Sequence, residues 1–132
     1  MHIVKRNIFR LLALLSLVLL ICFSCSSDDS GSNNNSSNDN YYVKYIIDAP
    51  GPYGRFSNWT ASTPSGLYSN SGYQTSGWTQ TYGPLNKGFL CKVEIGDYQG
   101  GTPTIEIHVS KNDEPFALKK IVTGSSASYV IN

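Results

Sequence analysis

The sequence predicts an all-β fold, a single antiparallel β-sandwich of about seven strands over residues 41–132. Apolar residues recur with a period of two from Tyr41 onward, and no stretch shows the 3.6-residue period of a helix over ten residues. Clusters of Gly, Ser, Asn and Pro interrupt the alternation at the spacing of sandwich turns. A chain of 132 residues allows one such domain, not two.

The N-terminus has the features of a secretory signal. Lys5, Arg6 and Arg10 precede a Leu-rich run over residues 11–23, which is 13 residues long. A transmembrane helix needs about 20 residues, so this run is too short to be one. A positive start followed by a short apolar run defines a signal peptide, which we assign to residues 1–24.

The end of the apolar run resembles a bacterial lipobox. Ser24 is small, Cys25 follows it directly, and the chain is then entirely polar. The resemblance implies cleavage before Cys25 and a diacylglyceryl thioether on its sulfur, so we expect a membrane partner through this lipid anchor. Cys22 and Phe23 differ from the small or aliphatic residues that are commonest at their positions. The alternatives are an ordinary secretory signal with an incidental Cys, or an uncleaved N-terminal anchor.

A polar linker follows over residues 25–40. Beyond Cys25 it contains no apolar side chain, so nothing is buried to offset the entropy of ordering. A flexible chain of this length spans roughly 20 Å. The run from Ser26 to Asp29 resembles the acidic export signal of Bacteroidetes surface lipoproteins. That resemblance implies that the protein is anchored in the outward-facing leaflet of the outer membrane. The alternative is a solvated linker that carries no export signal.

The charge balance does not favour a nucleic-acid partner. The formal net charge is +1, but residues 25–132 keep seven Lys and Arg against nine Asp and Glu, a net charge of −2. Nucleic-acid binders usually carry a basic patch. We therefore expect no nucleic acid among the partners.

Three segments alternate most regularly, at residues 41–48, 89–95 and 104–109. Each has one apolar and one largely polar face, as in a strand that lies between core and water. Gly96-Asp97 and Gly100-Gly101 bracket a predicted loop at 96–101, and 111–115 is typical of a polar hairpin loop. Shorter or Gly-interrupted patterns predict further strands near residues 55–60, 66–75, 77–82, 116–121 and 128–131. This arrangement favours a sandwich of the immunoglobulin or transthyretin kind.

Three patterns occur in a suggestive order. The first is Tyr-x-Val-x-Tyr-x-Ile at residues 41–47; the second is 78–81 followed by 87–90; the third is 104–109 followed by 128–131. In this order they resemble the mycobacterial-membrane-protein-small (MmpS-like) domain and its lipoprotein relatives. The resemblance implies a small secreted β-sandwich and a role as accessory subunit of an envelope transporter. The mycobacterial members differ in having a transmembrane helix and a disulfide.

Few side chains could carry chemistry. Cys91 lies on the apolar face of its strand, where a free Cys behaves as a small hydrophobe. His108, the one His in residues 41–132, is expected on the solvent-exposed face of another strand, so a Cys–His nucleophile pair is not expected. The sequence lacks the ligands of a metal site. We expect no metal, no cofactor and no enzymatic activity; paired strand carboxylates for glycoside hydrolysis are the alternative.

Aromatic side chains gather between residues 50 and 84, among Gly, Ser, Asn and Gln. Flat rings beside amide and hydroxyl groups suit sugar faces and peptide strands, and resemble the composition of antibody binding loops. We expect at least one of Trp59 and Trp78 in the core, as in many sandwiches. The candidate ligand-binding residues are Tyr53, Tyr68, Tyr73 and Tyr82.

Together these features predict a non-catalytic lipoprotein of the outer membrane, exposed at the cell surface, whose sandwich binds a glycan or a protein partner. The alternative is the transporter accessory subunit that the MmpS-like resemblance implies. A third reading is a structural spacer without a ligand. An outward-facing domain favours the first function and a periplasmic domain the second.

Overall fold

The structure is a computed structural model that describes residues 38–49 and 51–132. These residues form two four-stranded antiparallel sheets packed into a β-sandwich, which confirms the predicted fold class with eight strands instead of about seven. The predicted signal peptide at 1–24, the predicted lipidation site Cys25 and the linker up to residue 37 lie outside the described residues. Within the described part, no helix is long and apolar enough to cross a membrane.

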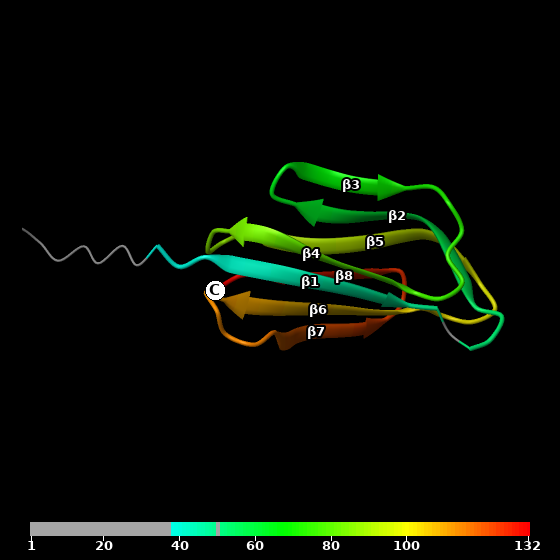
Figure 1. The fold of residues 1–132 in the computed structure, drawn as a ribbon. Coiled ribbons are helices and arrows are strands. Elements are labelled where there is room, and N and C mark those ends of the chain that lie inside the picture. Colours follow the sequence, from blue (N-terminus) through cyan, green and yellow to red (C-terminus); the bar gives the residue numbers. More distant parts are fainter. Residues whose placement is uncertain (1–37, 50) are drawn as a thin grey trace, which may run out of the picture. The chain divides into compact units, whose positions relative to one another are not determined.

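The strands are β1 Tyr41–Asp48, β2 Arg55–Thr63, β3 Gly66–Asn70, β4 Trp78–Leu85, β5 Leu90–Gln99, β6 Thr104–Lys111, β7 Ala117–Thr123 and β8 Ser126–Val130. One sheet has the order β4–β1–β6–β7 and the other β3–β2–β5–β8 (Figure 1). The hairpins β2–β3 and β6–β7 stay within one sheet, whereas every other connection crosses between the sheets. These crossings hold the two layers together at both ends.

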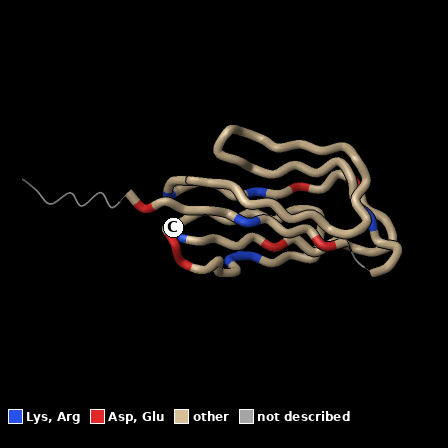
Figure 2. Tube along the Cα trace, viewed as in Figure 1, with Lys and Arg blue, Asp and Glu red and all other residues tan. Residues whose placement is uncertain are grey.

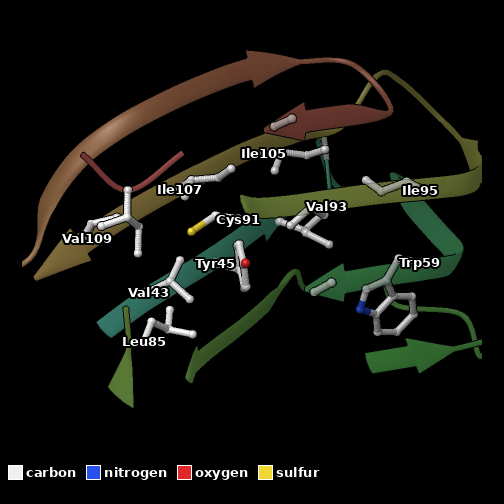
Figure 3. Packing of buried hydrophobic residues seen from close by; sticks show 14 of the residues in the cluster. Val43, Tyr45, Trp59, Leu85, Cys91, Val93, Ile95, Ile105, Ile107 and Val109 are labelled. Atoms are coloured by element: carbon white, nitrogen blue, oxygen red, sulfur yellow. The ribbon is translucent and has the colours of Figure 1, made fainter. Parts of the chain in front are cut away.

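Strict alternation along the central strands builds the core between the sheets (Figure 3). On β1, Val43, Tyr45 and Ile47 are fully buried, and the residues between them are partly exposed. Each large apolar side chain buried in this way stabilises the fold by about 1.5–3 kcal/mol. The fully buried side chains contributed by the other strands include Phe56, Trp59, Cys91, Val93, Ile105 and Ile107, and Ile131 adds another just after β8.

The alternation of the central strands breaks most clearly in β2. Phe56 and Trp59 are both buried although they are three residues apart, a spacing that puts side chains on opposite faces of a regular strand. Asn58, which lies between them, has a φ of 54°, in the left-handed region that Asn tolerates better than most residues. Across the ladder, a Cβ on Gly96 would lie only 3.0 Å from the Cβ of Asn58. Gly96 therefore permits the close approach that this break requires.

Two predicted boundaries are wrong. The predicted loop at 96–101 begins later, because β5 continues through Gly96 to Gln99. The predicted strand at 66–75 ends earlier, at Asn70, whose side-chain oxygen accepts a 2.7 Å hydrogen bond from the backbone N–H of Gly72. This short-range bond turns the chain out of the ladder, as Asn side chains commonly do.

The two ends of the sandwich differ. The chain enters β1 at one end, where Asp39 lies 2.9 Å from the Lys111 ammonium. The opposite end, which we call the distal end, is formed by the connections at 51–54, 71–77 and 100–103 (right in Figure 1). Residues 38–40, which lead into β1, therefore lie at the end away from these connections.

Candidate ligand-binding groove

The four candidate tyrosines lie in two places. Tyr53 and Tyr73 belong to the connections of the distal end and keep 88% and 68% of their surfaces exposed. Tyr68 on β3 and Tyr82 on β4 are instead half-buried against the core. The distal end therefore brings two of the four together and leaves the other two along the side of the sandwich.

Along that side, aromatic rings fill the space between the edge strands β3 and β4. Tyr68 stacks on Trp78 at a centroid distance of 5.4 Å, and Trp78 meets Trp59 edge-on at 6.1 Å. Tyr82 packs obliquely on Tyr45 at 6.1 Å. Burial raises the pKa of the Tyr82 phenol, and the nearby Tyr68 adds to that shift. These contacts give both tyrosines a packing role, and the full burial of Trp59 confirms that at least one Trp is in the core.

A groove of about 220 Å³, which we call the distal groove, opens between β2, β5 and the segment that follows β3. The backbones of Phe56 and Gln74 exchange two hydrogen bonds, of 3.1 and 2.9 Å, which bring Tyr73 to the edge of β2. On the other edge of β2, Phe56 pairs with Tyr98 of β5. The residues that line the distal groove are Arg55, Phe56, Ser57, Tyr73, Asp97, Tyr98 and Gln99.

Arg55 is the positive group of the distal groove. Its Nε donates a 3.0 Å hydrogen bond to Oε1 of Gln99, and Nη2 donates to the same oxygen. The guanidinium carbon lies 5.1 Å from the ring centroid of Tyr73, the geometry of a cation–π contact. Within residues 38–49 and 51–132, Arg55 forms no ion pair with a carboxylate.

Asp97 is the negative group of the same groove. Its partner in the β2–β5 ladder is Ser57, two residues along from the pair formed by Arg55 and Gln99. Oδ2 of Asp97 accepts a hydrogen bond from the side-chain amide of Asn58. A carboxylate has about four acceptor sites, so Asp97 can accept further hydrogen bonds from a ligand.

A second depression of about 440 Å³ adjoins the distal groove and shares Arg55 and Gln99 with it. It is bordered by Tyr53 and by Gly100 of the β5–β6 connection. Arg55 therefore lies between the two exposed tyrosines of the distal end. A ligand in either depression could contact its side chain.

Of the seven residues that line the distal groove, the sequence analysis named only Tyr73 as a candidate and missed the other six, among them Arg55, Asp97 and Gln99. Arg55 begins a strand beside Gly and Pro, and Tyr98 and Gln99 fall in a segment predicted to be loop. Their proximity depends on the register between β2 and β5, which aligns Arg55 with Gln99 and Phe56 with Tyr98. The one signal in the sequence was that Tyr98, like the candidate tyrosines, lies next to Gly, Asp and Gln.

Outside the distal end, the reactive side chains are separated. Cys91 is buried and unpaired, and burial raises the pKa of its thiol to about 11. His108 lies on the outer face of β6, with Nε2 2.6 Å from a carboxylate oxygen of Glu106. The part of the chain that the structure describes contains no group of three His, Cys, Asp or Glu side chains placed to hold a metal ion. Figure 2 shows Lys, Arg, Asp and Glu scattered along the trace.

Comparisons of the chain with protein-family models, with curated proteins and with solved structures give no match. The arrangement of the distal groove therefore carries the functional argument. It offers exposed rings, a cation and amide and carboxylate acceptors at one end of a rigid sandwich, a set suited to holding a small polar ligand.

Proposed function

We propose that this protein is a non-catalytic, surface-exposed lipoprotein of the outer membrane, and that its sandwich binds a glycan through the distal groove. The observation that carries the proposal is the exposure of Tyr53 and Tyr73 beside Arg55 and Gln99, at the end opposite the start of β1. A lipid anchor at Cys25 would join the domain at that opposite end and leave the distal groove free.

The size and chemistry of the groove favour a sugar over a protein partner. A stable protein interface buries about 800 Å² per partner, with a central apolar cluster. The distal groove is smaller than a typical drug-sized pocket of about 300–1,000 Å³. A single sugar ring can lay its apolar face on a Tyr ring while its hydroxyl groups exchange hydrogen bonds with Gln99 and Asp97.

We expect the affinity to be weak. The groove is shallow, its rings are exposed, and only a few hydrogen-bonding groups converge on it. Such a site corresponds to a Kd in the micromolar to millimolar range, roughly −8 to −4 kcal/mol. Repeated units along a polysaccharide would raise the apparent affinity of a surface that carries many copies.

Substitution of Tyr73 tests the proposal. After a glycan array has identified a ligand of the wild-type protein, Tyr73→Ala should weaken its binding at least tenfold, because the stacking ring is lost. The melting temperature should change little, since the exposed ring contributes only the contact with Arg55, on the order of 0.5–1 kcal/mol.

Tyr68→Ala is the matched control. It removes a Tyr ring that stacks on Trp78 outside the groove, so it should lower the melting temperature and leave binding intact in the folded fraction. The proposal is wrong if the wild type retains no glycan, or if Tyr73→Ala binds as well as the wild type.

A further inference from the structure

We propose that the distal groove takes an acidic sugar, whose carboxylate forms an ion pair with Arg55. This inference rests on the proposed function, because it names the class of glycan that the same groove binds. It starts from a guanidinium that stands in a ligand-sized groove without a carboxylate partner among the described residues.

The hydrogen bonds of Arg55 leave one edge of its guanidinium free. Nε and Nη2 each donate one N–H to Oε1 of Gln99. These two bonds use the Nε–Nη2 edge of the guanidinium. The two N–H groups of the Nη1–Nη2 edge have no partner among the described residues. This edge has the fork geometry that binds the two oxygens of a carboxylate in a bidentate pair.

The contacts of Arg55 also hold the guanidinium in place before a ligand arrives. Gln99 is its partner in the β2–β5 ladder, and the Tyr73 ring supports the guanidinium at 5.1 Å. Because Gln99 and Tyr73 are neutral, they orient the cation without forming an ion pair with it.

Asp97 adds a negative charge to the distal groove, beside the positive charge of Arg55. It lies two residues along β5 from Gln99, and its carboxylate is engaged by the neutral amide of Asn58. A sugar acid matches both groups, because its carboxylate pairs with Arg55 while a hydroxyl group on the same ring donates to Asp97. Densely anionic ligands are disfavoured, since a second negative charge would lie against Asp97.

The expected preference is moderate because Arg55 is exposed. An exposed ion pair contributes up to about 1 kcal/mol, so the acidic sugar should bind about two- to fivefold more tightly than its neutral counterpart. Salt screens exposed charges, with a Debye length near 10 Å at 0.1 M and near 3 Å at 1 M. The preference should therefore shrink as sodium chloride is raised.

The experiment compares ligands that differ in the charge of one carboxyl group. Galacturonic acid and its methyl ester form one pair, and 3′-sialyllactose and its methyl ester form another. Each is titrated against the full chain in mild detergent, and binding is followed by ligand-observed NMR at low and high salt. We expect each acidic probe that binds to do so about two- to fivefold more tightly than its partner at low salt.

Three substitutions assign the preference to Arg55. Arg55→Gln should abolish the difference between the paired probes and retain weak binding of both. Arg55→Lys should keep only part of the difference, because an ammonium lacks the planar fork. Lys87→Gln removes the same charge from the β4–β5 connection, at the other end of the sandwich, and should leave the preference unchanged.

The outcomes separate the two proposals. Equal binding of the paired probes, or a preference that survives in Arg55→Gln, overturns the acidic-sugar inference and leaves the glycan-binding function standing. If none of the four probes binds and the glycan array also stays empty, both proposals fail. A preference lost in Arg55→Gln and kept in Lys87→Gln supports the inference.

Discussion

Cys91 and Tyr45 lie side by side at the centre of the core, on facing sheets (Figure 3). Both are fully buried, and the Tyr45 hydroxyl donates a 2.9 Å hydrogen bond to the carbonyl oxygen of Ser62. Burial is the main cause that raises the pKa of each group, to about 11 for the Cys91 thiol and well above its usual range for Tyr45. Both side chains are therefore neutral in the folded protein at physiological pH.

This burial makes the fold sensitive to alkaline pH. The thiol has an ordinary pKa of 9.0 and a folded pKa of about 11, so its contribution to stability is fully present below pH 9 and is lost as the pH rises to about 11. We expect the free energy of unfolding to fall by about 2–3 kcal/mol through this group. Denaturant unfolding at a series of pH values should show a smaller fall for Cys91→Ala.

At neutral pH, Cys91→Ala should cost only about 1 kcal/mol, because it removes one small buried atom group. In the native state, a maleimide should label the wild type no more than it labels Cys91→Ala. In denaturant, the wild type should react at one additional thiol. Parallel pH curves for the two proteins, or rapid labelling of native Cys91, would contradict the burial of the thiol.

At the scale of the elements, two connections of the distal end touch through a glycine. Gly100, after β5, has a φ of +77°, and a Cβ added there would lie 2.5 Å from the carbonyl oxygen of Tyr53. No side chain fits at that distance unless one backbone moves. Both segments border the second depression, so this contact helps to set the shape of the distal end.

We predict that Gly100→Ala lowers the free energy of unfolding by roughly 2–4 kcal/mol, from left-handed strain of about 1–2 kcal/mol and from the displaced Tyr53 carbonyl. Gly88→Ala is the control, because Gly88 has a φ of +88° with nothing within 4 Å of an added Cβ. It should cost only about 1 kcal/mol. Equal losses in denaturant unfolding would show that the close contact with Tyr53 does not constrain the fold.

Strand β7 shows how an edge strand departs from regular alternation. Leu118 and Ile121 keep about half of their surfaces exposed, at 49% and 54%. Lys119 and Lys120 lie between them, at a register shift opposite Ile107 and His108 of β6. Lysines and irregular pairing on an edge discourage association with the edge of another sheet. The weak apolar pattern of residues 116–121 reflects this exposed position.

At the scale of the whole molecule, the distal end of the sandwich lies opposite the start of β1. The proposed lipid anchor at Cys25 precedes β1 in the chain. We predict that Cys25→Ser moves the protein from the membrane fraction to the soluble fraction, because the acyl chains are lost. Cys22→Ser is the control, since Cys22 lies in the predicted signal peptide, and it should stay with the membrane.

Protease treatment of intact cells completes this test. A surface-exposed domain should be digested without permeabilising the outer membrane. A domain that is digested only after permeabilisation would be periplasmic, which contradicts surface exposure and favours the transporter accessory role. A Cys25→Ser protein that still sediments with membranes would contradict the lipid anchor.

The sequence by itself determined the all-β class, the position of most strands and the central core. Alternation specifies which face of a strand is buried, and this held for β1, β5 and β6, where one face packs into the core and the other is partly exposed. It also placed Cys91 correctly in the core. Two predicted boundaries were wrong. Asn70 ends β3 through a hydrogen bond from its side chain, and Gly96 lies within β5, where it allows a close approach to Asn58.

Only the tertiary structure decided which aromatic rings are available to a ligand. Tyr68 and Tyr82 resemble Tyr53 and Tyr73 in their local sequence, yet strand pairing puts the first two against the core and the last two at the distal end. The meeting of Arg55, Tyr73 and Gln99 likewise depends on contacts between segments 18 to 44 residues apart. Local propensity carries no information about such contacts, because the register of paired strands and the packing of the two sheets fix them.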